Sequence, residues 1–215
     1  MADVKGRRYG FVILTRRCID CEACQVACRA ENQVPLGHSR NWVRSGGVEG
    51  AFPDLSLRFE PGNCMHCDHP VCVDVCPTGA SHQRADGVVL VDANRCVGCR
   101  YCVVSCPYEA RFIDEERGLA DKCTLCVHRL DRGTPPSCVT TCVGGARWAG
   151  DLNDPNSLVS RLLATYPHRQ LLTELGTGPA VYYIDAPVPT DDRTGLPSVR
   201  GEVRDRLVHA AAKEV

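Results

Sequence analysis

Four cysteines between residues 96 and 107 constrain this chain more than any other feature. They are Cys96, Cys99, Cys102 and Cys106, and Pro107 follows the last of them. Three thiolates at steps of three residues can bind three iron corners of one cubane. The fourth lies about one helical turn further on, roughly 6 Å along a helix axis, so it is better placed to reach a neighbouring cluster. This spacing therefore indicates paired iron–sulfur clusters, in which the last cysteine of a run ligates the other cluster.

The remaining cysteines form three related blocks. We number the four blocks in chain order, so the run from Cys96 to Cys106 is block three. Block one is Cys18, Cys21, Cys24 and Cys28, block two is Cys64, Cys67, Cys72 and Cys76, and block four is Cys123, Cys126, Cys138 and Cys142. Sixteen cysteines in 215 residues would suggest disulfides in a small secreted chain, but disulfides do not explain such regular clustering. Block four alone resembles a zinc ribbon. Four related blocks favour a single type of cofactor, and we expect four [4Fe–4S] clusters.

The repetition predicts how the blocks share ligands. Blocks one and three have identical spacing, which indicates a duplicated two-cluster ferredoxin. Blocks two and three are close in sequence and should exchange their fourth cysteines, while blocks one and four pair around them. The hypothesis has four ligand sets: set 1 is Cys18, Cys21, Cys24 and Cys142; set 2 is Cys123, Cys126, Cys138 and Cys28; set 3 is Cys64, Cys67, Cys72 and Cys106; set 4 is Cys96, Cys99, Cys102 and Cys76.

This pairing predicts an α+β fold of tandem, interleaved ferredoxin-like modules, with short strands and helices around the four clusters. The expected parts are an outer module (1–35 with 116–152), an inner module (60–115), an inserted hairpin or loop (36–59), and a C-terminal helix, strand and extended tail (153–215).

Local patterns predict the elements of these modules. Apolar and β-branched runs predict strands at 9–15, 87–92, 110–114 and 180–185, and a helix is expected at 26–32. Residues 41–44 could pair with 55–59 around a Gly46-Gly47 turn. Asp154-Pro155 predicts a helix start, with Leu158, Leu162 and Leu163 on its apolar face. From Pro187 onward, the composition predicts a tail that lies on a partner or is disordered.

Composition excludes two classes of function. The formal net charge is −1, so the chain lacks the basic surface that nucleic-acid binding needs. No apolar run approaches the roughly 18 residues of a membrane span. Arg7-Arg8 faintly resembles a twin-arginine signal, but opening the first strand explains these residues better. If the protein works at a membrane, we expect a partner to take it there.

Charged residues beside the cysteines are candidates for tuning the clusters. Arg17, Arg95, Arg100, Lys122 and Arg129 could raise reduction potentials, or they could be solvated surface charges. His66 and His128 could donate to sulfur, although such histidines more often satisfy backbone groups. No nucleophile with its base and no phosphate loop stands apart from the cysteines, so no catalytic site of its own is predicted.

At this point the sequence resembles the four-cluster electron-transfer subunits of molybdopterin oxidoreductases. It is most similar to the iron–sulfur subunits of polysulfide and thiosulfate reductases. The resemblance covers about residues 8–152 and is carried by short motifs: Cys28-Arg29-Ala30-Glu31-Asn32, Cys64-Met65-His66-Cys67, Cys76-Pro77-Thr78-Gly79-Ala80-Ser81, Cys106-Pro107-Tyr108-Glu109-Ala110-Arg111, and the run from Lys122 to Leu130. The nitrate reductase type has tryptophan where this chain has Cys99, and the formate dehydrogenase type has a C-terminal membrane helix.

The resemblance implies a relay of electrons between two partners, a molybdopterin catalytic subunit and a quinone-reactive integral membrane subunit. Each cluster takes the number of its ligand set. Cluster 1 would face the molybdenum subunit and cluster 4 the membrane subunit, so that electrons from quinol would pass through clusters 4, 3, 2 and 1. It also implies peripheral attachment to a membrane through these partners. Export with a twin-arginine-signalled partner to the outer face is the favoured location, and the cytoplasmic face is the alternative.

Two other functions stay open from sequence. A freely diffusing polyferredoxin would share the cysteine blocks but should lack the segment that follows Pro187. A zinc-stapled binding module would also use cysteine, but it would be colourless and would give no EPR signal on reduction.

Overall fold

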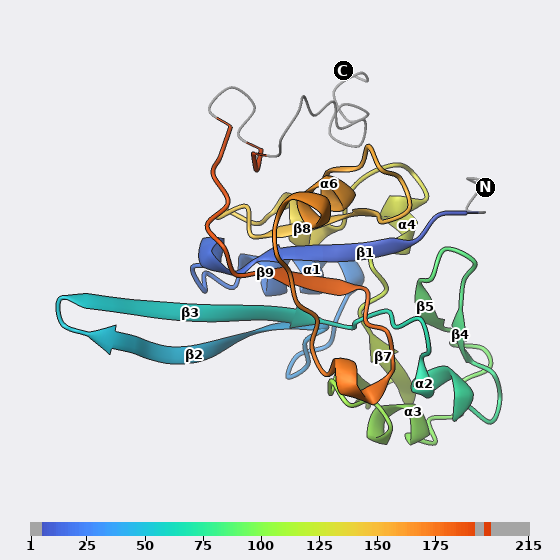
Figure 1. The fold of residues 1–215 in the computed structure, drawn as a ribbon. Helices are drawn as coiled ribbons and strands as arrows, with labels where there is room; N and C mark the ends of the chain where they lie inside the picture. The colour runs from blue at the N-terminus through green and yellow to red at the C-terminus, as the bar shows by residue number, and fades with distance from the viewer. Residues whose placement is uncertain (1–5, 192–195, 199–215) are drawn as a thin grey trace, which may run out of the picture.

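The computed structural model of the chain describes residues 6–191 and 196–198. A three-stranded sheet forms its centre, in the order β8 (Arg147–Asp151), β1 (Tyr9–Leu14) and β9 (Val181–Ile184). Strand β1 pairs antiparallel with β8 and parallel with β9 (Figure 1). All six residues of β1 are buried, which explains its continuous apolar sequence. The strands predicted at 9–15 and 180–185 are therefore confirmed.

Helix α6 (Leu158–Thr165) packs on this sheet. Leu158 and Leu162 are buried with Val12 and Leu14 of β1, and Leu163 is half-buried beside them, as the apolar face predicted. The predicted helix start was wrong. Ser157 is the N-cap, and its Oγ accepts a hydrogen bond of 3.1 Å from the Ser160 amide. Asp154 instead closes the preceding turn, where its side chain accepts from the Asn156 amide.

The Leu162 side chain is fully buried against the sheet. Replacing Leu162 by alanine should lower the free energy of unfolding by about 2–5 kcal/mol, because it removes buried methyl groups and leaves a cavity. The exposed Leu175→Ala is the matched control and should change the free energy by less than about 0.5 kcal/mol. Denaturant unfolding followed by circular dichroism measures both. Equal effects from the two variants would contradict this description of the core.

Three antiparallel hairpins lie outside the central sheet. They are β2 (Asn41–Ala51) with β3 (Asp54–Asn63), β4 (Ser81–Gln83) with β5 (Val89–Val91), and β6 (Arg111–Asp114) with β7 (Leu119–Lys122). The first hairpin is longer than predicted and extends away from the rest of the fold (Figure 1). Its turn lies between Ala51 and Asp54, so the turn predicted at Gly46-Gly47 was wrong. Those glycines form a bulge, where the register shifts between Ser45 and Val48.

The cysteine-rich part of the chain contains the helices α1 (Ala23–Asn32), α2 (Val71–Asp74), α3 (Tyr101–Val104), α4 (Val127–Leu130) and α5 (Ser137–Thr140), of which α4 carries no cysteine. Single 3₁₀ turns occur at η1 (Thr15–Arg17) and η2 (Thr173–Leu175). The third cysteine of each block is the second residue of a helix, in α1, α2, α3 and α5 respectively. The fold is thus of the mixed helix and strand type, with the cysteine blocks in equivalent local settings.

The segment after Pro187 packs on the chain where the structure describes it. Val188 is buried, and Arg17 donates a 2.9 Å hydrogen bond to its carbonyl. The first residues of the predicted tail therefore pack on this chain. The rest of that prediction falls on residues 192–195 and 199–215, which are outside the described residues. In the part described, no helix has the length and apolar character needed to cross a membrane.

Candidate metal centres

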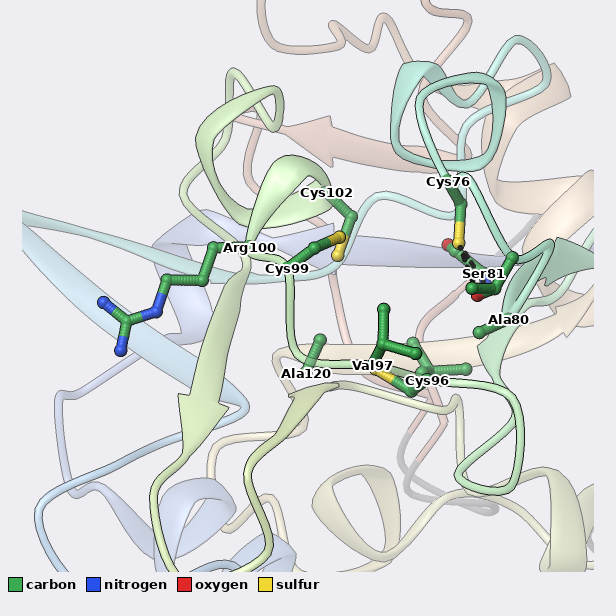
Figure 2. A pocket seen from close by; sticks show the side chains of 11 residues that line it. Cys76, Ala80, Ser81, Cys96, Val97, Cys99, Arg100, Cys102 and Ala120 are labelled. Atoms are coloured by element: carbon green, nitrogen blue, oxygen red, sulfur yellow. Dashed lines mark hydrogen bonds between the residues drawn. The ribbon is translucent and has the colours of Figure 1, made fainter.

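Three cavities are each lined by four cysteines that come from two blocks. Cys18, Cys21, Cys24 and Cys142 line the first, Cys64, Cys67, Cys72 and Cys106 the second, and Cys76, Cys96, Cys99 and Cys102 the third. The structure thus brings together the residues of sets 1, 3 and 4. Figure 2 shows set 4, with its four side chains around one space. The three cavities are nearly equal in size, as one type of cofactor would require.

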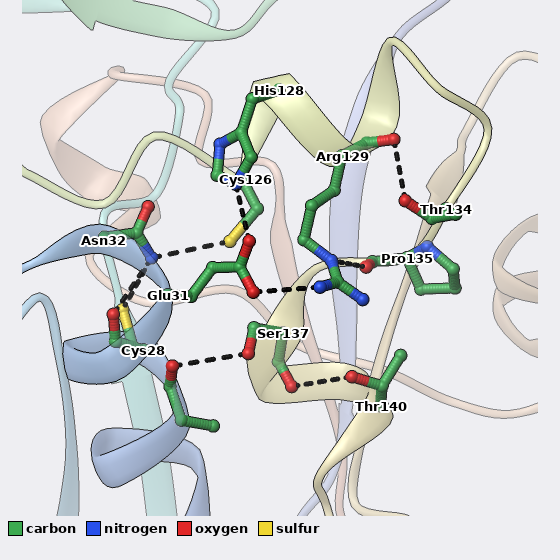
Figure 3. Close-up of polar contacts among 11 residues, drawn as sticks. Cys28, Glu31, Asn32, Cys126, His128, Arg129, Thr134, Pro135, Ser137 and Thr140 are labelled. Carbon is green, nitrogen blue, oxygen red and sulfur yellow. Dashed lines mark hydrogen bonds and ion pairs between the residues drawn. The ribbon is translucent and has the colours of Figure 1, made fainter.

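The four cysteines of set 2 lie together where α1, which carries Cys28, meets block four, which supplies the other three. Asn32 donates to the sulfur atoms of both Cys28 and Cys126, at 3.6 and 3.7 Å (Figure 3). Burial, together with the neighbouring Cys126 and Cys28, raises the pKa of Cys138 to about 12, although Arg147 acts in the opposite direction. Cys123 behaves in the same way, because burial and the nearby Cys28 and Cys138 raise its pKa. Block one and block four therefore meet at Cys28.

Polar contacts hold these two blocks against each other. Glu31 of α1 forms ion pairs with His128 at 2.7 Å and with Arg129 at 2.9 Å (Figure 3). Ser137 of α5 donates to the Ala27 carbonyl of α1 at 3.3 Å. These bonds fix the end of block one beside block four, at the place where Cys28 joins the cysteines of block four.

A left-handed residue recurs at the same place in every block. The residue before the second cysteine has a positive φ in each: Asp20 (54°), His66 (45°), Gly98 (66°) and Leu125 (56°). This conformation turns backbone amides toward a sulfur atom. The Leu125 amide donates to Cys123 at 3.3 Å, and the Asp20 amide interacts with Cys18 in the same way. Amide donors of this kind stabilise the charged thiolate that metal ligation requires.

The turn after the fourth cysteine also repeats. Gly79, Glu109 and Gly145 each follow a fourth cysteine by three residues and have positive φ. The Ser81 amide donates to Cys76 Sγ at 3.3 Å, and the Ala146 amide donates to Cys142 Sγ at 3.2 Å. Burial alone would raise the pKa of Cys76, but the amides of Ser81 and Thr78 outweigh it and lower the pKa.

Several other thiols are held in surroundings that oppose ionisation without a metal. Burial raises the pKa of Cys28 to about 11 and of Cys67 to about 12. Such thiols ionise when a metal binds, with release of their protons. All sixteen cysteines are free thiols. Together with the amide donors, this environment fits cysteines that ligate metal.

Three cations are buried among the cysteines. Arg111, Lys122 and Arg147 are 6, 1 and 1% exposed, respectively. Within residues 6–191 and 196–198, the ion pairs are all formed by cations other than these three. No carboxylate there pairs with Arg111, Lys122 or Arg147. A buried charge is costly unless an opposite charge compensates it. The cysteines are the groups that can supply negative charge at these positions, once ionised.

Arg111 reaches set 3 directly, because its Nη2 donates to Cys72 Sγ at 2.8 Å. Burial lowers its pKa, but the charges of Cys72, Cys64 and Cys102 outweigh burial and raise it above the usual value. Cys102 belongs to set 4, so this guanidinium lies between sets 3 and 4. Its Nε and Nη1 atoms are buried without a hydrogen-bond partner. Unpartnered donors beside ionisable sulfur fit an anionic group at this place.

Lys122 and Arg147 occupy the corresponding places beside other sets. Lys122 Nζ donates to the carbonyls of Val89, which lines the set 3 cavity, and of Cys123 in set 2. Arg147 lines the set 1 cavity, and the charges of Cys138 of set 2 and Cys24 of set 1 raise its pKa. One buried cation therefore lies at each junction, between sets 4 and 3, sets 3 and 2, and sets 2 and 1.

The five residues predicted to tune the clusters have different surroundings in the structure. Lys122 is buried among the sulfur atoms, whereas Arg100 is exposed and points away from the set 4 cysteines (Figure 2). Arg95 is exposed and donates to the Thr78 carbonyl at 2.7 Å. Arg17 lines the set 1 cavity and binds Val188 and Thr190, while Arg129 pairs with Glu31.

The two histidines also differ from each other. His66 Nδ1 accepts a 3.1 Å hydrogen bond from the Val89 amide, so it satisfies a backbone group, as expected. Its Nε2 is buried without a partner. His128 pairs with the Glu31 carboxylate, so the expectation that it satisfies the backbone was wrong.

Sequence reasoning did not single out Arg111 and Arg147 as candidates, although a signal was present. Each is the fifth residue after the last cysteine of its block, Cys106 or Cys142. The equivalent residue of block two is Ser81, whose Oγ accepts a 2.9 Å hydrogen bond from Arg111. A cation that repeats at one position of a duplicated motif is a candidate for a shared structural role.

The residues present fit [4Fe–4S] clusters. In the described residues, no group of three or more Cys, His, Asp or Glu side chains is close enough to hold one metal ion. The sulfur atoms of sets 1, 3 and 4 instead surround a cavity, as they must when each thiolate binds a different iron. Amide donors and buried cations complete the environment that such anionic groups require.

Comparison with known proteins gives consistent matches. Two family models, both described as 4Fe-4S dicluster domains, match residues 17–80 and 55–152. A tetrathionate reductase subunit of Salmonella typhimurium is 50% identical over 183 residues, which cover 82% of this chain and 72% of that protein. A polysulfide reductase chain of Wolinella succinogenes is 40% identical over 182 residues (83% and 95%). Protein NrfC of Escherichia coli is 45% identical over 184 residues (85% and 82%).

Proposed function

Because this protein belongs to the iron–sulfur electron-transfer subunits of molybdopterin oxidoreductase complexes, we propose that it carries four [4Fe–4S] clusters between two partners. One partner is a molybdopterin catalytic subunit, and the other is a quinone-reactive membrane subunit. The chain is not catalytic alone. The observation that carries the proposal is the meeting of cysteines from two blocks around each of three similar cavities.

The proposed ligands are the four sets named above. Sets 1, 3 and 4 are supported by their cavities, and set 2 by the bonds from Asn32 to Cys28 and Cys126. The exchange of cysteines supports interleaved modules, an outer one from 1–35 with 116–152 and an inner one from 60–115. The pairing of β1 with β8 favours this division, because it joins the two parts of the outer module.

The proposed order of clusters is 4, 3, 2, 1 from the membrane partner to the molybdenum partner. The buried cations support it, because each interacts with two successive sets. The ends are also the most accessible sets, since Cys21 of set 1 and Cys99 of set 4 are the exposed cysteines. The complex would attach this chain to the membrane periphery, on the outer face if a partner carries a twin-arginine signal.

A bound [4Fe–4S] cluster supplies reversible one-electron reduction with little change in bonding. The chain supplies the rest of the chemistry. Its backbone amides donate to sulfur, its buried cations balance negative charge, and its core buries all four cysteines of set 2 away from water. These features decide how easily each site accepts an electron.

Anaerobic purification of the native complex tests the proposal. We expect about 16 iron atoms for each copy of this chain, a broad visible absorption that dithionite bleaches, and EPR signals from reduced clusters. A molybdenum-containing subunit should purify with it. About four zinc and no iron would contradict the electron-transfer function. A stable monomer with the full iron content and no molybdenum subunit would instead support a free carrier.

A further inference from the structure

We propose that Arg111, Lys122 and Arg147 are fixed counter-charges, one at each junction between successive clusters, and that each raises the reduction potentials of the two clusters beside it. This inference rests on the proposed function, because it requires the four clusters. It adds the identity of the residues that set their potentials.

The first argument is that no carboxylate found in the described residues pairs with these charges, and that their hydrogen-bond partners other than sulfur are neutral oxygens. A buried guanidinium or ammonium without a carboxylate destabilises a fold by several kcal/mol. Ionised cysteines around a metal cluster remove that cost. The cations and the clusters therefore depend on each other: the cations stabilise negative charge at the sets, and the sets stabilise the buried cations.

The second argument is position. Arg111 contacts Cys72 of set 3 at 2.8 Å and interacts with Cys102 of set 4. Lys122 bonds the carbonyl of Val89 at the set 3 cavity and that of Cys123 in set 2. Arg147 lines the set 1 cavity, and it also interacts electrostatically with Cys138 of set 2. Each cation thus acts on one particular pair of clusters.

The effect on potential follows from Coulomb's law. Reduction adds one electron to a cluster, so a neighbouring positive charge stabilises the reduced form more than the oxidised form. Burial weakens solvent screening, and the interaction falls with distance. Each cation should therefore act strongly on its own two clusters and weakly on the others. It should also reduce the repulsion between electrons on those two clusters.

An EPR-monitored redox titration of the complex, with dithionite as the electron donor, tests the pairwise pattern. Arg111→Gln should make the equilibrium constant for one-electron reduction at least tenfold less favourable at clusters 3 and 4, which corresponds to about 59 mV. Clusters 1 and 2 should change much less. Lys122→Gln should act in the same way on clusters 2 and 3, and Arg147→Gln on clusters 1 and 2.

Two further variants separate charge from structure. Arg58→Gln removes an exposed cation from the projecting β2–β3 hairpin, away from the four sets, and should leave all four potentials unchanged. Arg111→Lys keeps the charge and should stay close to the unaltered protein. The Lys122→Gln titration gives a reading that does not depend on Arg111, in case Arg111→Gln lowers the iron content.

The inference is overturned if iron-replete Arg111→Gln and Lys122→Gln shift no potential, or shift all four equally. It is also overturned if Arg111→Lys shifts the potentials as far as Arg111→Gln does. Failure of the proposed function would look different, because the unaltered complex would then lack iron or EPR signals before any variant was made.

Discussion

Alanine at Cys106 is expected to remove the same EPR signal as alanine at Cys64, and not the signal removed by alanine at Cys99. Cys106 belongs by sequence to block three, but it lines the set 3 cavity with Cys64, Cys67 and Cys72. Loss of one ligand should therefore affect cluster 3 while the other three cysteines of block three still hold cluster 4. The expected loss is up to about four iron atoms per chain.

The reciprocal variant is the control. Cys76 lines the set 4 cavity, so Cys76→Ala should affect the same signal as Cys99→Ala. EPR spectra of the four reduced variants, with iron analysis, measure the grouping. If Cys106→Ala and Cys99→Ala lost the same signal, each block would close its own cluster and the exchange would be wrong.

The second large effect concerns the close approach of blocks one and four. An ideal Cβ on Gly144 would lie 2.1 Å from the Arg17 carbonyl oxygen. Both residues line the set 1 cavity. Gly144 follows Cys142 by two residues, and Arg17 directly precedes Cys18. Gly144→Ala must therefore push these backbones apart, since overpacking of this kind costs about 1–3 kcal/mol or more. We expect cluster 1 to be lost, with its EPR signal and up to about four iron atoms.

Gly46→Ala is the matched control for Gly144→Ala. Its Cβ would have its nearest contact at 3.5 Å, with the Arg58 carbonyl oxygen, which is an ordinary distance. That variant should keep all four signals and its iron. Full iron content and an unchanged cluster 1 signal in Gly144→Ala would contradict the assembly of set 1 from blocks one and four.

Spacing allowed the cysteine blocks to be interpreted because ligation geometry is local. Three cysteines at steps of three define one site, and the fourth is set apart by about a helical turn. Strand β1 was predictable for a similar reason, since its six apolar residues are buried in the centre of a sheet. The exchange of fourth cysteines followed from duplication, and the cavities place the same residues together.

Two local predictions failed where several residues could play one role. Gly46-Gly47 allows a turn or a bulge, and the pairing of Val48 with Leu57 extends the hairpin beyond them. Asp154 and Ser157 are both good N-caps, and the buried position of Leu158 favours a helix that starts after Ser157. Tertiary packing decided both cases, and sequence alone does not contain it.

The buried cations were the hardest part of the site to predict. Lys122 and Arg100 both lie beside cysteines in sequence, yet only one of these two is buried. Arg111 and Arg147 are further from their cysteines along the chain, but folding brings them between two sets. Burial of a charged side chain depends on the arrangement of several elements, and a single motif does not encode it.

Iron anomalous diffraction from anaerobic crystals of the complex tests the central claim most directly. We predict four separate cubane clusters in this chain, each bonded to three cysteines of one block and one cysteine of another. A cluster bonded to all four cysteines of a single block, or isolated metal ions in place of clusters, would contradict it.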